Sequence, residues 1–427
     1  MSDLRRRLRA RRKINRPFDM NTTDILVLGA GPTGTALAAA LASRGLSVAQ
    51  IDPAPERPWP NRYSAWDDEL AALGLSKTAG QRWPRSEFVL PNGRVLALER
   101  GYAALDGKRL RTALQHALVD VRLGRVVRVS HHADSSQVEL ADGTQAEARL
   151  IVDATGHQSP FVVRDGPPAQ AWQVAWGAEF ANCEAPYATD AMRFMDWRAH
   201  EASDEDPRPT FLFAKPLGGR RWFFEETQLI GAPAMDLGLL ERRLQARLAR
   251  DGVNGQFDGG IERCCFPMDP PLPVLDQPVL GFGAAASLVH PATGYLLMRT
   301  LRAVAPVADA LQAGIAEGRS PRDIVRDGWQ VLWPPELLDA ARLLRFGART
   351  LLAMDREQIG KFYEAFFAIE PQSWRDYLSG DLPAGPLARI MLQVFAASGV
   401  ATQWRLARQG LGDPWPLLKG IARLAAN

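Results

Sequence analysis

The sequence predicts an α/β protein: a parallel-sheet nucleotide-binding domain, an inserted antiparallel β-sheet domain, and a helical C-terminal region. Three observations predict this fold. A glycine-rich turn joins a short apolar strand to a helix near the N-terminus, apolar alternation recurs over residues 166–274, and helical spacing of apolar residues follows from about residue 326. A chain of 427 residues also exceeds one ordinary core, so two or three units are expected.

Composition limits the function. The chain is 46% hydrophobic and 23% charged, as in globular proteins, and its net charge of +3 gives no field for nucleic-acid binding. No apolar run approaches the roughly 20 residues of a membrane span, and no signal-peptide core is present. The sequence therefore predicts a cytoplasmic protein that is soluble or peripherally attached to a membrane, without a nucleic-acid partner.

The N-terminus is strongly basic, with "RRRLRARRKINR" at residues 5–16. Residues 1–20 are predicted to form a disordered basic segment, unless translation starts at Met20. The alternative is a tether to anionic lipid, to which each basic residue contributes about 1 kcal/mol.

Cysteine and histidine patterns exclude a metal cluster. The three cysteines, Cys183, Cys264 and Cys265, show no CxxC spacing, and the six histidines show no ligand spacing. An odd number of cysteines favours a reducing compartment.

The first folded segment predicts a βαβ unit. An apolar strand at residues 25–28 precedes a turn with GxGxxG spacing, then an alanine-rich helix to about Arg44 and a strand ending at Asp52. The turn consists of Gly29, Ala30, Gly31, Pro32, Thr33 and Gly34. In a Rossmann-type domain such a turn lets the backbone approach a pyrophosphate at the helix N-terminus, while the acid binds a ribose. A tight turn without a ligand is the alternative.

Two later segments complete this domain, which is predicted over residues 21–75, 105–165 and 275–325. The second segment is predicted to form a β-meander, followed by the buried strand "LIVDATG". The third has a strand, a glycine turn containing Gly283, a loop with His290, Pro291 and Gly294, and a helix starting near Gly294. That helix N-terminus is expected to face negative charge.

The remaining segments are predicted as a substrate-binding domain (76–104 and 166–274) and a helical C-terminal region (326–427). "AWQVAWGAEF", "TFLFAKPL" and "RWFFEETQLIGAP" alternate as antiparallel strands do, and "PELLDAARLLRFGARTLLAM" has helical spacing. If 221–229 is a strand, Glu225 and Glu226 point to opposite faces and cannot cooperate in one pocket. The alternative places both acids in solvent at a sheet edge.

Several motifs together carry a family resemblance. They include "NRYSAWDDELAALGL", "DATGHQSPFV", "FMDWR", "FFEET" and "CFPMDPPLPVLDQPVLGFGAAASLVHPATGYLLMRTL". From about Asp24 to about Leu382 the chain resembles the plant and cyanobacterial lycopene cyclases, a flavoprotein family related to flavin hydroxylases and geranylgeranyl reductases. Phe224 departs mildly from the family's usual Leu or Val. Ala284 stands where flavin hydroxylases carry Asp, which favours a cyclase.

The resemblance implies a reaction and its cofactors. A cyclase of this family protonates the terminal double bond of lycopene, closes a ring through a carbocation and releases a proton, using reduced FAD without net redox change. NADPH would be the electron donor. The substrate would be lycopene or another linear carotene, met at a membrane surface beside other carotenoid-pathway enzymes. The alternatives are an FAD/NADPH-dependent reductase or hydroxylase of polyprenyl or carotenoid substrates, and a non-catalytic FAD-binding or carotenoid-carrying protein.

The resemblance also implies catalytic residues. Glu225 takes the family's essential acid position, and a carboxyl group in an apolar pocket keeps its proton near neutral pH. Asp196 is a second candidate for proton handling, or a partner of Arg198. His290 would orient the flavin or support its anionic form, or be a buried structural residue.

Cofactor and cavity-wall residues complete the expected site. Arg109 would reach FAD phosphate or ribose, unless it lies on a solvated helix face. The aromatic residues expected to keep water from a carbocation are Trp222, Phe223 and Phe224, with Trp172 and Trp176 nearby.

Overall fold

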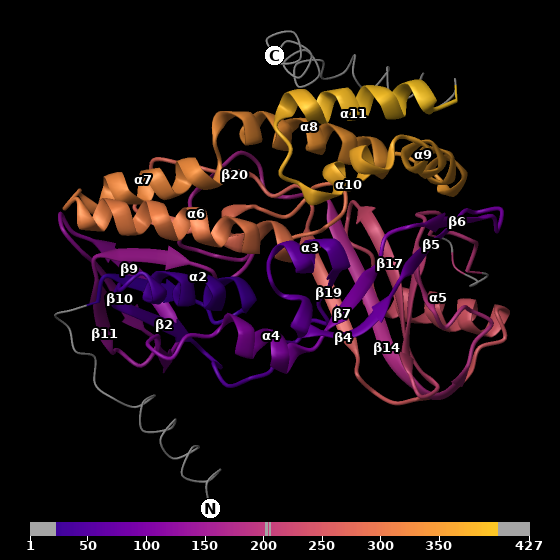
Figure 1. Ribbon diagram of the computed structural model, residues 1–427, viewed down its shortest axis with the longest axis horizontal. Coiled ribbons are helices and arrows are strands. Elements are labelled where there is room, and N and C mark those ends of the chain that lie inside the picture. The colour runs from indigo at the N-terminus through magenta and orange to yellow at the C-terminus, as the bar shows by residue number, and fades with distance from the viewer. Residues whose placement is uncertain (1–22, 201–203, 205, 400–427) are drawn as a thin grey trace, which may run out of the picture.

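The computed structural model describes residues 23–200, 204 and 206–399. Figure 1 shows the parallel sheet and its helices on the left, the large β-sheet on the right, and the C-terminal helices across the top. The basic segment predicted at residues 1–20 and the end of the predicted helical region, 400–427, lie outside the described residues.

A five-stranded parallel sheet forms the nucleotide-binding part, with the order β21-β12-β1-β2-β8. Its strands are β1 (Ile25–Leu28), β2 (Val48–Asp52), β8 (Asp120–Leu123), β12 (Leu150–Asp153) and β21 (Val279–Gly281). β1 is central, pairing with β12 on one side and β2 on the other. The carboxyl ends of these strands therefore meet at one edge, where open α/β sheets bind ligands.

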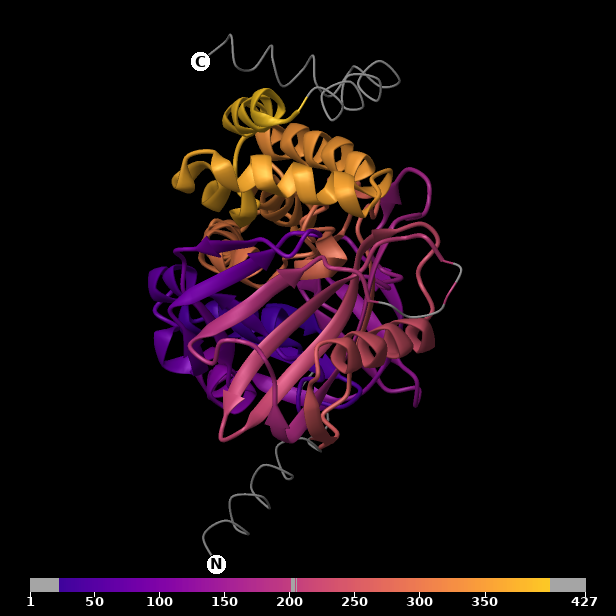
Figure 2. The same ribbon diagram turned by 90° about the vertical axis from the view of Figure 1, so that its right-hand side faces the viewer.

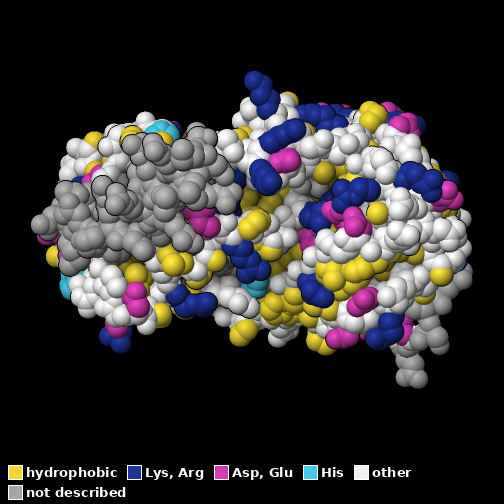
Figure 3. All heavy atoms as spheres, turned by 90° about the horizontal axis from the view of Figure 1, so that it is seen from below, with side chains coloured by type: hydrophobic (Ala, Val, Ile, Leu, Met, Phe, Trp, Pro, Cys, Tyr) yellow, Lys and Arg dark blue, Asp and Glu magenta, His cyan; other side chains and the backbone are white. Residues whose placement is uncertain are grey.

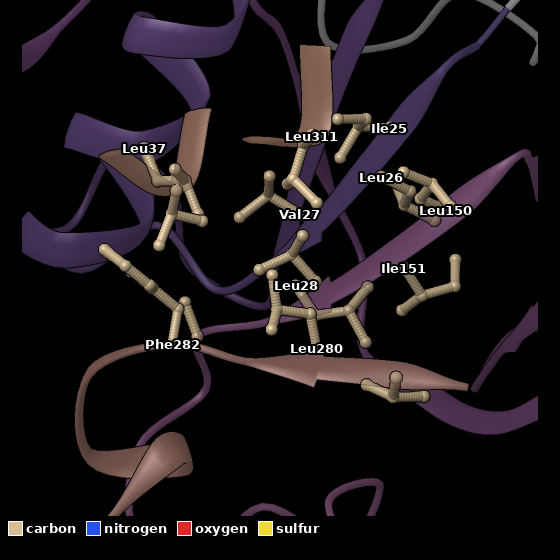
Figure 4. Packing of buried hydrophobic residues seen from close by; sticks show 14 of the residues in the cluster. Ile25, Leu26, Val27, Leu28, Leu37, Leu150, Ile151, Leu280, Phe282 and Leu311 are labelled. Carbon is tan, nitrogen blue, oxygen red and sulfur yellow. The ribbon is translucent and has the colours of Figure 1, made fainter. Parts of the chain in front are cut away.

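Helices α2 (Pro32–Ser43), α6 (Leu297–Ala316) and α7 (Pro321–Leu332) pack with this sheet. Figure 4 shows Val27, Leu37 and Leu311 meeting in its core, and all three side chains are buried. The predicted end of the first helix near Arg44 is confirmed to within a residue, but the helix begins at Pro32, inside the predicted turn. The later helix begins at Leu297, three residues after Gly294, because the intervening loop turns first through Gly294 at φ +76°.

The predicted β-meander is also present, as β9 (Val126–His131), β10 (Ser136–Leu140) and β11 (Gln145–Ala148). These three strands form an antiparallel sheet of their own. A smaller sheet consists of β3 (Ser64–Trp66), β7 (Tyr102–Leu105) and β4 (Ala79–Trp83), flanked by α3 (Asp67–Ala72) and α4 (Gly107–Leu114). A two-stranded sheet pairs β13 (Arg164–Asp165) with β20 (Leu272–Pro273).

The large sheet has eight strands in the order β18-β14-β17-β16-β15-β5-β6, with β19 also paired to β14. Its strands are β5 (Arg85–Val89), β6 (Val95–Leu98), β14 (Trp172–Glu184), β15 (Ala191–Asp196), β16 (Phe211–Gly218), β17 (Arg221–Gly231), β18 (Asn254–Phe257) and β19 (Glu262–Pro267). The sheet is antiparallel as predicted except for the parallel pair β5–β15, which joins two segments distant in sequence. Helix α5 (Leu237–Arg250) covers one face (Figure 2).

The C-terminal helices are α8 (Pro335–Leu352), α9 (Arg356–Ala368), α10 (Pro371–Ser379) and α11 (Ala384–Ala397). Aromatic residues join them to the sheets: Tyr363 of α9 contacts Phe88 and Trp197, and Trp374 of α10 contacts Trp66. Within the described part of the chain, no helix combines the length and apolar character needed to cross a bilayer.

Candidate active site

The glycine-rich turn forms a cradle between β1 and α2. Gly29 has φ +95°, and a Cβ atom there would lie 2.7 Å from the carbonyl oxygen of Ala154. A Cβ atom on Gly34 would lie 2.4 Å from the Gly29 carbonyl oxygen, whereas Gly31 faces open space. No side chain caps the start of α2, so its first N–H groups remain available to an anion.

Asp52, at the end of β2, fixes this turn. Its Oδ2 accepts a hydrogen bond from the Ala30 N–H at 2.8 Å, and its Oδ1 accepts one from the Ala54 N–H at 2.7 Å. The Trp59 indole donates to the Ala30 carbonyl at 2.7 Å. Strand, turn and following loop are thereby tied together at the cavity edge.

A cavity of about 660 Å³ extends from this turn to the large sheet. The turn contributes residues 29–33, and Asp52 stands beside them. The other end is lined by strands β14, β16, β17 and β19 and by Leu296 and Leu297. Leu297 begins α6, whose first turn has neither a side-chain cap nor an acidic residue. The cavity therefore meets two uncapped helix N-termini.

A second, smaller cavity of about 110 Å³ adjoins the first at Glu225, which lines both. We call it the inner chamber. Its lining is mostly apolar and comes from the large sheet, β7, α9, α10 and the loop before α6: Tyr102, Gln173, Phe194, Met195, Phe211, Phe213, Glu225, Thr227, Leu229, Thr293, Tyr295, Tyr363, Phe367 and Leu378.

The predicted alternation along β17 is confirmed. Glu225 and Thr227 line the inner chamber, whereas Glu226 is fully buried on the α5 side. In the neighbouring strand Gly177 lies opposite Glu225, and a Cβ atom there would lie 2.9 Å from the Glu225 Cβ and 2.6 Å from the Phe223 ring. A glycine at this position leaves room for the Glu225 side chain.

Burial and the negative charge of Glu262 raise the pKa of Glu225 to about 7. Two neighbours act in the opposite direction: the charge of Lys215, and a hydrogen bond of 2.9 Å that the Thr227 hydroxyl donates to Glu225 Oε1. The raising effects dominate, so the carboxyl group holds its proton close to neutral pH.

Glu226 has a different environment although it is the next residue. Its two carboxylate oxygens accept hydrogen bonds from Arg247 at 2.7 and 2.8 Å, and the Thr210 hydroxyl donates to it at 2.5 Å. Glu226 and Arg247 are both fully buried. This closed ion pair anchors α5 to the sheet.

The structure does not place Asp196 at either cavity. It is fully buried at the end of β15 and paired with Arg193 and Arg198. Burial alone would raise the pKa of Asp196, but the hydrogen bonds from Arg198 and the charge of Arg247 bring the net shift below the usual value. The alternative interpretation, an ion pair with Arg198, is the one present.

His290 is likewise buried away from the cavity lining, 1% exposed. Its Nε2 lies 3.2 Å from the Tyr377 carbonyl oxygen and its Nδ1 accepts from the Ala292 N–H at 3.3 Å, which fits the neutral tautomer protonated on Nε2. Burial and the charge of Arg299 lower its pKa to about 3. The ring therefore carries no charge near neutral pH and joins its loop to α10.

The other predicted cofactor residues form two groups: those at the cavity or the glycine-rich turn, and those outside the cavity lining. Gly294 lines the large cavity, and Gly283 lies against Thr33 of the glycine-rich turn, where a Cβ atom would come within 2.9 Å of the Thr33 hydroxyl. Arg109 is exposed on α4 and donates to the Ala79 carbonyl at 3.0 Å, outside the cavity lining. Pro291 is also outside that lining.

The aromatic residues around Glu225 differ from those expected. Trp222, Phe224 and Trp176 pack in the core beneath α5, with Trp172 at its edge, so they are on the face opposite Glu225. Only Phe223 of the expected set shares its face. The inner chamber takes its aromatic rings instead from other elements: Tyr102, Phe194, Phe211, Phe213, Tyr295, Tyr363 and Phe367.

Sequence reasoning missed Lys215 and Glu262, which line the cavity beside Glu225. Both side chains are buried, at 3% and 8% exposure. Alternation within "TFLFAKPL" could have placed Lys215 on the same face as Phe213. No local signal could have placed Glu262, because its position depends on the pairing of β19 with β14.

Solved structures identify the class of fold. A geranylgeranyl bacteriochlorophyll reductase-like protein from Thermoplasma acidophilum aligns with a TM-score of 0.69 at 14% identity, covering 91% of this chain and 100% of its own. A p-nitrophenol 4-monooxygenase from Pseudomonas putida aligns with a TM-score of 0.57 at 16% identity, covering 88% and 98%. The chain thus shares the fold of FAD-dependent monooxygenases and geranylgeranyl reductase-like proteins.

Sequence relatives identify the family. The family profile described as "Lycopene cyclase protein" matches residues 24–403. A lycopene beta cyclase of Synechococcus elongatus is 36% identical, covering 90% of this chain and 96% of the relative, and one of Arabidopsis thaliana is 34% identical, covering 95% and 83%. A capsanthin/capsorubin synthase of Citrus sinensis is 32% identical, covering 96% and 84%. The chain belongs to the lycopene cyclase family.

Proposed function

We propose that this chain closes β rings on lycopene or another linear carotene, with reduced FAD bound and NADPH as the electron donor. One observation carries the proposal. Glu225, whose pKa is raised to about 7, stands between an apolar chamber and a cavity that reaches a nucleotide-binding turn. The names of the relatives supply the substrate class.

The chemistry assigned to Glu225 is general acid catalysis. Its protonated carboxyl group donates to the terminal double bond, which leaves a tertiary carbocation. The neighbouring double bond attacks that carbon and closes a six-membered ring. The ring then releases a proton, for which the Glu225 carboxylate left by the first step is an available base, so the product is neutral and no electrons are gained or lost overall.

The chamber walls favour this reaction over hydration. Apolar residues exclude the water that would convert the cation into an alcohol. The faces of aromatic rings such as Tyr102 and Phe213 attract positive charge, which stabilises the cation without offering it a nucleophile.

The residues present fit a flavin dinucleotide. The cradle at Gly29 and Gly31 and the uncapped start of α2 would hold the pyrophosphate, and Asp52, which lines the same cavity, would accept a hydrogen bond from a ribose hydroxyl. The uncapped start of α6 would face the part of the flavin ring system that carries negative charge. When bound, reduced flavin supplies an electron-rich surface that stabilises positive charge.

Peripheral membrane association is part of the proposal because carotenes dissolve in bilayers. Figure 3 shows hydrophobic side chains gathered near the middle of one face with Lys and Arg residues among them. Such a surface suits an interface between apolar chains and anionic head groups.

Expression in lycopene-accumulating cells tests the function, with the Glu225→Gln protein as control. Pigment analysis should show γ-carotene if one end is closed and β-carotene if both are. Unchanged lycopene, with the protein folded and flavin bound, would contradict the proposal. NADPH consumption in proportion to product would indicate the rival reductase or hydroxylase.

A further inference from the structure

Three ionisable groups, the buried Lys215 and Glu262 and the half-buried Glu225, lie together on the cavity face of the large sheet. Gly177 of β14 pairs with Glu225 of β17 on one side and with Glu262 of β19 on the other. The two carboxyl groups therefore flank a residue without a side chain. Lys215 of β16 pairs with Phe223, two residues along the same face from Glu225. All three side chains line the same cavity.

We propose that Glu262 and Lys215 are positioning residues of opposite effect, Glu262 holding the proton on Glu225 and Lys215 limiting how tightly it is held. The proposal rests on the proposed role of Glu225 as general acid. Neither residue is required to touch the substrate.

Charge balance supports this assignment. A buried group of charges is costly unless its members compensate one another. With Glu225 protonated, the negative Glu262 and the positive Lys215 sum to zero. Ionising Glu225 would leave a net negative charge in the same enclosed space. The neutral arrangement is the one in which Glu225 can donate a proton.

Fixed contacts hold both positioning residues in place. The Lys215 ammonium group donates to the Ser64 hydroxyl at 3.2 Å and lies 4.9 and 4.6 Å from the ring centres of Phe213 and Phe223. Glu262 accepts a hydrogen bond from the Arg62 backbone N–H at 3.0 Å. These contacts keep the charges beside the acid when the cavity is filled.

Electrostatics agree with the geometry. The charge of Glu262 raises the pKa of Glu225 and that of Lys215 lowers it, while burial lowers the pKa of Lys215 itself against the two carboxylates. The other groups facing the cluster stay neutral or are paired. Burial raises the pKa of Tyr63, Tyr102, Tyr295 and Cys264, and the Arg62 guanidinium pairs with Glu179.

The test compares Glu262→Gln with Lys215→Met by two measurements. The first is the pH dependence of cyclisation in the flavin-loaded enzyme. Glu262→Gln should move the alkaline limb to lower pH; a shift of about one unit lowers the protonated fraction, and the rate, roughly tenfold well above the pKa. Lys215→Met should move the same limb to higher pH. A merely structural role would not produce opposite shifts.

The second measurement is independent of turnover. The infrared carbonyl band of protonated Glu225, identified by its loss in Glu225→Gln, should titrate at lower pH in Glu262→Gln and at higher pH in Lys215→Met. Glu184→Gln is the matched control, because Glu184 lies on β14 but is exposed and paired with Arg220. It should leave both the band and the limb unchanged.

The two proposals can fail separately. If cyclisation proceeds but both variants leave the limb and the band in place, or shift them in the same direction, the assignment of Glu262 and Lys215 is overturned. If no carotene is cyclised but the band still shifts in opposite directions, the proton-holding pair stands and the proposed substrate is wrong.

Discussion

Glu225 and Glu226 are neighbours in β17, yet the two faces of the sheet treat them differently. Glu225 faces two cavities, with a glycine opposite it and a lysine and a glutamate nearby. Glu226 is enclosed beneath α5 with both carboxylate oxygens bound to Arg247. On one face a carboxyl group keeps its proton; on the other a carboxylate is held by a cation.

The difference shows that burial alone does not decide what an acid does. Glu226 is fully buried and Glu225 is half-buried at the cavity wall, and it is Glu226 that has a dedicated counter-ion, Arg247, in contact. Glu225 shares Lys215 with Glu262, so the positive charge is divided between two acids. Binding a proton is the remaining way to neutralise the Glu225 carboxylate. Each prediction below breaks or sharpens this contrast.

Replacing Glu225 with Gln should have the largest effect. Cyclisation should fall by about 10²–10⁴-fold, because the general acid is lost while the shape of the side chain is kept. Pigment analysis and initial rates with bound flavin measure the loss. Full cyclisation by this variant would show that Glu225 is not the acid.

Stability should respond to pH in a defined sense. The pKa of Glu225 is raised from 4.5 to about 7 in the folded protein, so its contribution to stability is fully present below pH 4.5 and is lost as pH rises through 7. The Glu225→Gln protein lacks this loss. Denaturant titrations should therefore show it gaining stability relative to the parent between these pH values; a constant difference would contradict the raised pKa.

Replacing Glu226 with Gln should mainly affect stability. Arg247 would remain buried without its counter-ion, which costs about 3–5 kcal/mol. Urea unfolding measures the loss, and cyclisation per folded molecule should be retained. Reduced turnover at unchanged stability would show that the two faces are not independent.

Replacing Gly177 with Ala should disturb the catalytic face from within the sheet. The new methyl group would lie 2.6 Å from the Phe223 ring and 2.9 Å from the Glu225 Cβ, so both side chains must move. Overpacking of this kind costs about 1–3 kcal/mol. Turnover should also fall, since the acid is displaced. An unchanged rate would mean that its position tolerates such a shift.

Replacing Thr227 with Val should have the smallest effect. The hydroxyl that donates to Glu225 Oε1 is lost, and this hydrogen bond lowers the pKa of Glu225. The pKa should therefore rise, and the alkaline limb of cyclisation should move to higher pH by less than about one unit. A shift to lower pH would contradict the assigned direction.

Local sequence patterns correctly predicted the glycine-rich turn and the two faces of β17. The turn at Gly29 and Gly31 and the opposite orientation of Glu225 and Glu226 follow from residue spacing and the two-residue period of a strand. Such features depend only on neighbours in sequence. For the same reason, the predicted end of the first helix lies within a residue of the observed end of α2.

Contacts between segments distant in sequence determine the rest of the site. Asp196 is held by its near neighbours Arg193 and Arg198, but Glu262 reaches the acid only through the register of β19 on β14, and His290 is removed from the cavity by a partner distant in sequence. His290, for example, is fixed by Tyr377, 87 residues further along the chain. A single sequence contains no record of such contacts.

The inner chamber joins two segments with separate tasks. Its acid belongs to the sheet, but part of its outer wall consists of Tyr363, Phe367 and Leu378 from α9 and α10. Substitutions in these helices can widen or narrow the space for a carotene end group without moving a strand. Under the proposed mechanism, selectivity for the carotene end group can therefore change through the C-terminal region while Glu225 and its neighbours in the sheet stay the same.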